Sequence, residues 1–280
     1  MFTHLDHLIV AVDDLKAAAE NYQKLFGMKP VWSGEHKELG TSNALFTFNN
    51  TYFEILSATG EGLGADLVNQ YLNQSGEGLI GIVFATDDIK KAKSSLEEQG
   101  FNMPDISSGE GTNSSDQQVR KWKNLFLPPE LSRGLFSFII EHTEGELPSF
   151  KACQPSSPHK LDHVVINTND ADSFIDIYKD AFGIRLALDK TIEHWKKRML
   201  FFRLSKTTIE VIEEKNDQET TDTLWGLAWD VGSIEETHRR LLSEGVDITP
   251  IKKGIKDKTL VATINSHTHN VPTLIIEHLD

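Results

Sequence analysis

Two patterns of acid and imidazole side chains recur in this sequence of 280 residues. Asp6-His7 is followed by Glu54, and Asp162-His163 is followed by Glu210 at the same spacing. Imidazole and carboxylate groups can bind metal ions, and they can also move protons. A buried carboxylate is costly without a partner, so a Glu within an apolar strand predicts a cation or hydrogen-bond donors beside it. The pattern therefore predicts a polar site in each half of the chain.

The residues around Glu54 indicate the direction of its side chain. Period-two alternation places Tyr52, Glu54 and Leu56 on one face of a strand and Phe53 and Ile55 on the other. The apolar pair should pack on a helix, so we expect Glu54 to point into a cavity. Glu210 has apolar residues on both sides, and the same expectation applies to it.

Arg120 and Trp122 share one face of another predicted strand. Arg120 can hold a carboxylate through two parallel hydrogen bonds, while Trp122 forms an apolar wall. An exposed arginine and a core tryptophan explain the two residues equally well, so both interpretations stay open.

Composition and charge exclude several classes of protein. The formal net charge is −14, and the sequence has no long basic run, which disfavours binding to nucleic acid. No apolar stretch approaches the roughly 18–20 residues that span a bilayer, and the N-terminus lacks the features of a signal peptide. Cys153 is the only cysteine, so a disulfide within the chain is excluded. We expect a cytoplasmic protein with a small-molecule ligand and no nucleic-acid or membrane partner.

Internal repeats indicate the architecture. The segment Leu5-Asp6-His7 recurs as Leu161-Asp162-His163, and Ile139-Ile140-Glu141-His142 recurs as Ile275-Ile276-Glu277-His278. Each quarter of the chain has the pattern of a strand, a helix and further strands. In the first quarter these are a strand over 5–12, a helix over 15–26 and short strands over 31–32, 43–48 and 51–56. The second quarter has a strand over 79–85, a helix over 88–98 and strands over 119–127 and 135–141, and the third and fourth quarters begin at Leu161 and Leu224.

These quarters predict an α+β protein of four βαβββ units in two paired domains. Residues 148–158 are rich in Pro and Ser and show no periodicity, which is typical of a linker. We therefore predict an N-terminal domain over 1–147, a linker over 148–158 and a C-terminal domain over 159–280.

The four units resemble the vicinal oxygen chelate superfamily over nearly the whole chain. The motifs Leu5-Asp6-His7, Gly34-Glu35-His36, Leu39 to Leu45 and Tyr52-Phe53-Glu54-Ile55 are similar to its glyoxalase-like branch. The superfamily includes glyoxalases, extradiol dioxygenases, methylmalonyl-CoA epimerases and bleomycin-resistance proteins. The resemblance implies that each pair of units forms a curved mixed sheet around a cavity, with helices outside.

The resemblance also implies a set of metal ligands and substrate contacts. The ligands carried over to the first half are His7, Glu54 and Glu141, with Gly81 at the fourth position. The second half offers a second possible site at His163, Glu210 and Glu277, with Gly226 at the fourth position. One imidazole and two carboxylates can hold Zn, Mn, Ni, Co or Fe and leave positions open for substrate. The resemblance further implies that His36 and Asn43 line the first cavity and contact the substrate.

The leading functional hypothesis is a metal-dependent lyase or isomerase of the glyoxalase type, acting through an enediolate on a substrate with vicinal oxygens. Glu141 would move the proton, and Arg120 and Trp122 would bind the substrate. One alternative is a binding protein similar to bleomycin-resistance proteins, with no metal. Another is a ring-cleaving dioxygenase, which the glycines at the fourth positions disfavour because such enzymes need two His and one Glu. Four units in one chain allow a monomer or a homodimer.

Overall fold

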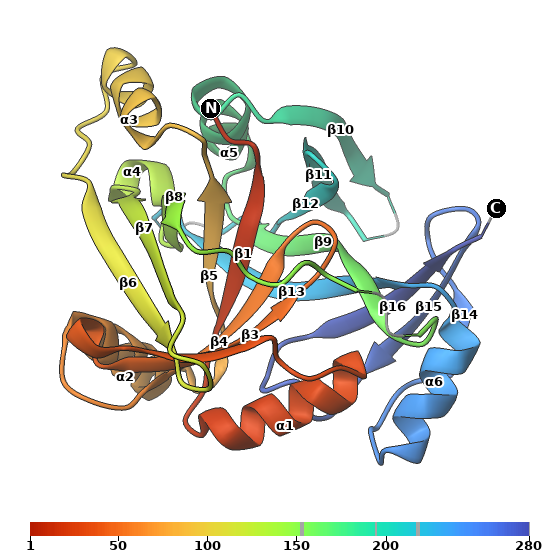
Figure 1. The fold of residues 1–280 in the computed structure, drawn as a ribbon. Helices are drawn as coiled ribbons and strands as arrows, with labels where there is room; N and C mark the ends of the chain where they lie inside the picture. The colour runs from red at the N-terminus through yellow and green to blue at the C-terminus, as the bar shows by residue number, and fades with distance from the viewer. Residues whose placement is uncertain (152–153, 194, 217–218, 280) are drawn as a thin grey trace.

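The computed structural model describes residues 1–151, 154–193, 195–216 and 219–279, and Cys153 lies outside them. Two βαβββ units form the first half (Figure 1). The first unit comprises β1 (His4–Ala11), α1 (Leu15–Phe26), β2 (Trp32–His36), η1 (Lys37–Leu39), β3 (Thr41–Thr47) and β4 (Tyr52–Ala58). After α2 (Leu63–Ser75), the second unit comprises β5 (Gly78–Ala85), α3 (Ile89–Glu98), β6 (Ser107–Asn113), β7 (Val119–Phe126), α4 (Pro129–Ser132) and β8 (Phe136–Glu144).

The second half repeats this order. Its first unit comprises β9 (Pro158–Thr168), α5 (Ala171–Ile175), the π-helical segment η2 (Asp176–Ala181), β10 (Arg185–Ile192), β11 (Lys197–Leu204) and β12 (Thr207–Glu213). Its second unit comprises β13 (Asp222–Val231), α6 (Ile234–Ser243), β14 (Lys252–Lys253), β15 (Thr259–Ile264) and β16 (Thr273–His278). No helix among the described residues is long and apolar enough to cross a membrane.

The first half closes into a barrel with the strand order β1-β4-β3-β2-β6-β7-β8-β5. The contact that closes it pairs β2 with β6, where Gly34 lies opposite Asn113 and Glu35 opposite Thr112. A Cβ atom on Gly34 would lie 2.7 Å from the carbonyl oxygen of Thr112, so glycine permits this close approach. The barrel therefore depends on a small residue at its last seam.

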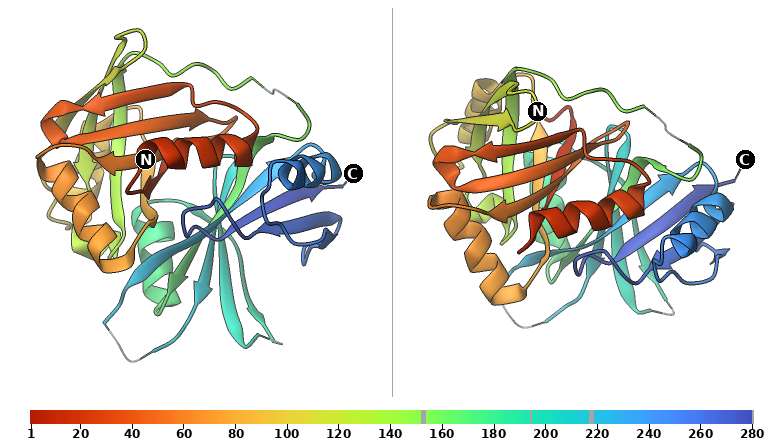
Figure 2. Two further views of the ribbon diagram at one scale, coloured as in Figure 1. Left: turned by 90° about the horizontal axis from the view of Figure 1, so that it is seen from below. Right: turned by 60° about the horizontal axis from the view of Figure 1, so that its bottom comes forward.

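The second half is an eight-stranded sheet with the order β10-β11-β12-β9-β13-β16-β15-β14. The edge strands β10 and β14 are at opposite ends of this order, so the sheet stays open where the first one closes. The two halves lie side by side, and residues 145–151, after β8, run along the outside (Figure 2).

Local sequence signals explain where the helices begin and end. Asp14 caps α1 because its side chain accepts a hydrogen bond from the Ala17 amide, and Gly27 ends the helix in the left-handed conformation with φ 65°. Asp88 caps α3 in the same way, and Ser233 caps α6. The predicted helices over 15–26 and 88–98 are therefore present at these positions.

Aromatic contacts between the halves join them into one hydrophobic core. The ring of Phe26 on α1 lies 5.0 Å from that of Trp229 on β13, and Phe84 on β5 lies 6.1 Å from Phe182, at the end of η2. The turn that follows β15 also docks on the first half, because Tyr22 donates a 2.8 Å hydrogen bond to the carbonyl of Thr268.

The predicted class is confirmed: the chain is a mixed α+β protein built from four units of the expected order. The sequence did not predict α2 or β6. The strands of the first sheet end at Glu144 and those of the second begin at Pro158, and the domain boundaries stay a prediction.

Candidate active site

A pair formed by His7 and Glu54 lies inside the first barrel. His7 on β1 and Glu54 on β4 come from parallel neighbouring strands, and the distance from His7 Nε2 to Glu54 Oε2 is 3.3 Å. The other ring nitrogen of His7 lies 2.6 Å from Asp6 Oδ1. A carboxylate that binds one ring nitrogen fixes the orientation of an imidazole and leaves the other nitrogen for chemistry. All three side chains are buried.

Asn43 and His36 extend this polar cluster across β3 and β2. The Asn43 amide donates to Glu54 Oε1 at 2.7 Å and lies 3.4 Å from His36 Nε2. His36 Nδ1 lies 3.0 Å from the hydroxyl of Thr41. Because the amide group of Asn43 donates, Nε2 of His36 must be the acceptor. The neutral ring then has its hydrogen on Nδ1, which donates a hydrogen bond to the hydroxyl oxygen of Thr41. Asn43 therefore holds the carboxylate of Glu54 in place.

Arg120 places a positive charge in the same region. It is 6% exposed, and its guanidinium carbon lies 5.6 Å from the ring centroids of both Trp32 and Tyr52. Its Nη2 lies 3.5 Å from His142 Nδ1. Among the described residues, no carboxylate forms an ion pair with Arg120. A buried charge without a counter-ion is unfavourable, so Arg120 is suited to bind an anion.

These groups line a cavity of about 930 Å³. The walls include His7, Glu54, His36, Asn43, Arg120 and Trp122 and, on the second unit, Phe126, Phe136, Phe138 and Ile140. Both units supply polar groups, and β8 adds the apolar side chains of Phe136, Phe138 and Ile140. The cavity therefore has the size and composition of a site for a small organic molecule. The structure brings together all four predicted substrate-binding residues, whose role stays a prediction.

Burial and pairing set the charges of the central groups. Burial disfavours protonation of His7, but the hydrogen bonds and charges of Asp6 and Glu54 outweigh it and raise its pKa. Burial disfavours the charged form of Glu54 too, but the His7 contact and the charges of His7 and His36 lower its pKa. Burial lowers the pKa of His36. These shifts favour the protonated form of His7, the ionised form of Glu54 and the neutral form of His36.

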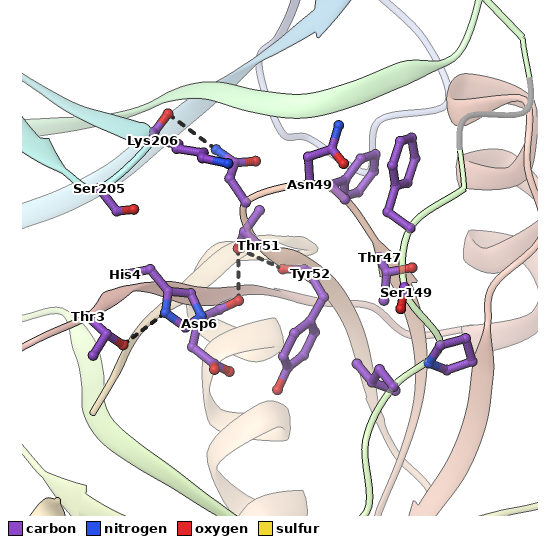
Figure 3. Close-up of a pocket in the computed structure, with 15 residues that line it drawn as sticks. Thr3, His4, Asp6, Thr47, Asn49, Thr51, Tyr52, Ser149, Ser205 and Lys206 are labelled. Atoms are coloured by element: carbon purple, nitrogen blue, oxygen red, sulfur yellow. Dashed lines mark hydrogen bonds between the residues drawn. The ribbon is translucent and has the colours of Figure 1, made fainter. Parts of the chain in front are cut away.

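A second pocket of about 410 Å³ lies behind the cluster (Figure 3). Asp6 and Tyr52 lie at its inner end, with Ser205 and Lys206 on one side and Ser149 on the other. Tyr52 lines both this pocket and the cavity, and its ring stacks on His7 at 4.4 Å. The hydrogen bond between Asp6 and His7 therefore crosses the wall that separates the two spaces.

The structure corrects the predicted direction of Glu141. Its carboxylate accepts hydrogen bonds from the Ile89 amide at 2.8 Å and from Lys123 Nζ at 3.0 Å. The Ile89 amide is among the free N–H groups at the start of α3, where a carboxylate is favoured. Glu141 thus lies on the helix side of β8, and it joins neither His7 nor Glu54 as ligand or base.

His142 takes the inward direction instead. It follows Phe138 and Ile140 on the cavity face of β8, and its Nε2 lies 3.0 Å from Asp6 Oδ2. Asp6 therefore bridges two imidazoles, those of His7 and His142. Because neighbouring residues of a strand point to opposite faces, the prediction that Glu141 points into the cavity was wrong.

The second half repeats both arrangements in a more open form. Glu277 accepts from the Ile234 amide at 2.7 Å, so it also caps a helix and is not joined to His163. Asp162 bridges His163 and His278, at 2.8 and 2.7 Å. The distance from His163 Nε2 to Glu210 Oε2 is 3.8 Å.

The residues present do not fit the metal centre that the sequence predicted. Catalytic metal sites usually take three protein ligands. Among the described residues, one group of three His, Cys, Asp or Glu side chains lies close enough to bind an ion, and it consists of Asp162, Asp230 and His278. Lys160 Nζ lies 2.9 Å from Asp230 Oδ2, so an ammonium group already pairs with one of these three side chains.

The glycines at the fourth predicted positions leave no room for a ligand. A Cβ atom on Gly81 would lie 3.0 Å from the side chain of Ile9 and 3.1 Å from that of Phe136. One on Gly226 would lie 2.6 Å from the carbonyl oxygen of Pro272. Neither half therefore assembles the predicted ligand set among the described residues.

A family model described as "Glyoxalase-like domain" matches residues 5–182, which is more than half of the chain. The chain belongs to the glyoxalase-like family. A second model, "Glyoxalase/Bleomycin resistance protein/Dioxygenase superfamily", matches residues 160–263, so both halves belong to the vicinal oxygen chelate superfamily.

Similar proteins of this superfamily differ in their activities. An ethylmalonyl-CoA/methylmalonyl-CoA epimerase of Cereibacter sphaeroides is 29% identical over 110 residues, which are 39% of this chain and 79% of the epimerase. The Mn(II)-bound glyoxalase from Novosphingobium aromaticivorans has a TM-score of 0.66 at 16% identity, over 100% of this chain and 83% of that chain. A mutant of 4-hydroxymandelate synthase from Streptomyces coelicolor has a TM-score of 0.66 at 14% identity, over 99% and 93%. The two structural matches show that this glyoxalase-like chain shares their fold.

Proposed function

We propose that the first half of this glyoxalase-like protein is a small-molecule lyase or isomerase site, in which Glu54 and His7 move a proton beside a carbonyl group. The observation that carries the proposal is the 3.3 Å approach of His7 Nε2 to Glu54 Oε2 at the wall of a large cavity. An epimerase and a glyoxalase among the similar proteins support chemistry of this class.

The charges of the pair suggest which group does what. Glu54 is ionised, so its carboxylate takes the proton from the carbon next to the carbonyl. The raised pKa of His7 favours its protonated form, whose Nε2–H donates to the carbonyl oxygen as negative charge develops there. Return of the proton to the same or another carbon completes an isomerisation, while departure of a substituent completes an elimination. Asp6 holds His7 in the orientation that both steps need.

The remaining polar groups bind and orient the substrate. Arg120 offers a guanidinium to an anionic substituent, and Trp32 and Trp122 cover the apolar part and exclude water. Asn43 fixes the carboxylate of Glu54 through its 2.7 Å hydrogen bond. Because the predicted metal ligands do not converge, no step in this mechanism uses a metal ion.

Exchange of hydrogen for deuterium from solvent tests the proposal. The full chain is incubated in D₂O with 2-oxooctanoate and, separately, with a methylmalonyl thioester, and the signal of the acidic C–H is followed by proton NMR. We expect exchange with at least one probe, and a loss of roughly 100-fold or more in Glu54→Gln. Glu210→Gln is the matched control and should keep the rate. Absence of exchange with both probes, or exchange that Glu54→Gln leaves intact, contradicts the proposal.

A binding protein without catalysis is the second candidate. The observation that favours it is that His7 and Glu54 already pair with each other, while Asn43 satisfies the second carboxylate oxygen. Under this proposal the cavity binds carboxylate ligands in an Arg120-dependent way, and neither probe exchanges hydrogen. Calorimetric binding together with the NMR assay separates the two candidates.

A further inference from the structure

Three buried polar atoms without a hydrogen-bond partner belong to residues that line the first cavity. They are Asn43 Oδ1, Arg120 Nε and Asn124 Oδ1, among five such atoms in the described part of the chain. Buried polar groups are normally paired because an unpaired one destabilises the fold. Three residues that line one cavity thus each have an unpaired polar group that a ligand could satisfy.

Two of the three atoms come from the same face of β7. Arg120, Trp122, Asn124 and Phe126 alternate with Lys121 and Lys123, whose amino groups pair on the outer side with Glu144 and Glu141. The first four all line the cavity. At 3.2–3.4 Å per residue, Arg120 and Asn124 are about 13 Å apart along the strand. The strand thus presents a cation and an unpaired acceptor at a fixed separation.

The surface between these two groups is apolar. The Trp122 ring packs over β6, where glycines leave space for it: a Cβ atom on Gly109 would lie 2.2 Å from the Trp122 Nε1. Beyond Asn124, Phe126 lies 5.2 Å from Phe138 by ring centroids. A ligand that reaches from Arg120 to Asn124 therefore lies along an aromatic surface and cannot be strongly hydrated in its middle part.

We propose that the cavity binds an elongated monoanion that has an apolar body and a hydrogen-bond donor at its far end. The anionic group binds Arg120, the body lies along Trp122, and a hydroxyl or amino group donates to Asn124 Oδ1. The inference deepens the proposed function, since it names the substrate class of the same cavity. It excludes small polar substrates, which cannot reach both groups at once.

Isothermal titration calorimetry with three probes tests the inference on the full chain. The probes are 8-hydroxyoctanoate, which has both groups, octanoate, which lacks the donor, and 1,8-octanediol, which lacks the charge. We expect 8-hydroxyoctanoate to bind roughly tenfold more tightly than octanoate, the factor that one buried hydrogen bond provides. The diol should bind most weakly, because it leaves the guanidinium unpaired.

Variants assign the two contacts separately. Arg120→Gln should weaken both acids by about 10- to 100-fold, as loss of a charge-assisted hydrogen bond does, and leave the diol unchanged. Asn124→Leu should remove the advantage of the hydroxy acid over octanoate, while Asn124→Ser, which keeps an acceptor, should retain part of it. Arg185→Gln and Asn102→Leu change exposed residues of the same types and serve as controls. Circular dichroism checks that each variant folds, and Asn124→Ser provides the comparison if the leucine variant does not.

Two results would overturn the inference: equal affinities for octanoate and 8-hydroxyoctanoate, or an advantage of the hydroxy acid that persists in folded Asn124→Leu. Either result means that water or a neighbouring group satisfies Asn124. Because the assay measures binding alone, its outcome is separate from that of the exchange assay. A hydroxy-acid preference without hydrogen exchange supports the ligand class and contradicts the catalytic proposal.

Discussion

The two halves of the molecule contain the same acid and imidazole groups in different surroundings. Asp6 bridges His7 and His142, and Asp162 bridges His163 and His278. In the first half the side chains of His7 and Glu54 are 3% and 9% exposed and 3.3 Å apart. In the second half His163 and Glu210 are both 17% exposed and 3.8 Å apart.

The neighbours of the repeated groups account for this difference. In the first sheet Glu54 pairs with Leu45, and Asn43 lies two residues before Leu45 on the same strand. In the second sheet Glu210 pairs with Phe201, and Met199 lies two residues before Phe201. Glu54 therefore has an amide donor where Glu210 has a thioether. Burial raises the pKa of Glu210. Burial also acts to raise the pKa of Glu54, but the hydrogen bonds from His7 and Asn43 and the nearby positive charge lower it overall. The repeated motif alone thus does not reproduce the polar cluster of the first half, since the neighbouring strand of the second half has no amide donor at the matching position.

Loss of the carboxylate that bridges two histidines should give the largest difference between the two halves. We expect Asp6→Asn to reduce the exchange rate by about 100-fold, because His7 and His142 lose the group that orients them. Asp162→Asn removes the matching bridge and should leave the rate unchanged. Proton NMR in D₂O measures both. A similar loss in the two variants would mean that the second half is also catalytic.

Closure of the barrel is the next difference to test. Gly34→Ala should destabilise the fold by about 1–3 kcal/mol, because its Cβ atom would meet Trp32 Nε1 at 2.3 Å and the Thr112 carbonyl oxygen at 2.7 Å. Gly78→Ala is the matched control, because its nearest atom is the Tyr71 hydroxyl at 3.6 Å. Thermal and urea unfolding give the free energies. Equal effects would show that the β2–β6 seam tolerates a side chain.

The opposite pKa shifts of Glu54 and Glu210 predict opposite effects on stability. The lowered pKa of Glu54 stabilises the fold above the ordinary Glu value of 4.5, and this contribution is lost as the pH falls through the folded-state pKa. The raised pKa of Glu210 destabilises the fold at neutral pH, and this cost shrinks once the pH falls below its higher folded-state pKa and is gone below the ordinary value of 4.5. At neutral pH Glu54→Gln should lower the melting temperature and Glu210→Gln should raise it. Both differences should shrink in acid, and shifts of the same sign would contradict the comparison.

A smaller change should make the second half resemble the first. Met199→Asn places an amide two residues before Phe201, as Asn43 is placed before Leu45, and we expect the pKa of Glu210 to fall. NMR titration of the Glu210 side-chain carboxyl carbon measures it, with Asn43→Met as the reciprocal variant that should raise the pKa of Glu54. An unchanged Glu210 would show that exposure, rather than the missing donor, sets its pKa.

Chelation should have the smallest effect. Because neither predicted ligand set converges, EDTA should leave the exchange rate of the first half unchanged, and His7→Ala/Glu54→Ala should not alter the metal content of the purified protein. Elemental analysis and the NMR assay measure these quantities. Stoichiometric metal that disappears in the double variant would restore the metal-dependent mechanism.

The sequence predicted the repeated units well, because apolar strands, polar helix caps and terminal glycines recur in each quarter. It also predicted that Glu54 points inward, since Phe53 and Ile55 mark the helix side of β4. The sequence could not show which face of β8 points into the cavity, because the neighbouring residues Ile139 and Ile140 are both apolar and both buried. The resemblance alone therefore assigned Glu141 to the cavity.

The closure of the first barrel and the unpaired polar atoms could not be predicted from the sequence for another reason. The strand β6 is rich in Ser and Gly, which gives no β-strand signal, and α2 begins after Gly62 without a side-chain cap. The value of Arg120 as an anion site depends on which carboxylates lie near it in space. Such information comes from contacts between distant segments, so the residue pattern left two interpretations equal.

The aromatic contacts of Phe26 and Phe84 across the two sheets have a consequence for how the molecule evolves. The second half cannot be deleted even where its own polar cluster has no function. Without Trp229 and Phe182, the rings of Phe26 and Phe84 would be exposed to water. Both copies should melt in a single cooperative transition, and mutations that loosen Trp229 should impair the distant cavity without touching it. The second half therefore has a structural role in supporting the first half.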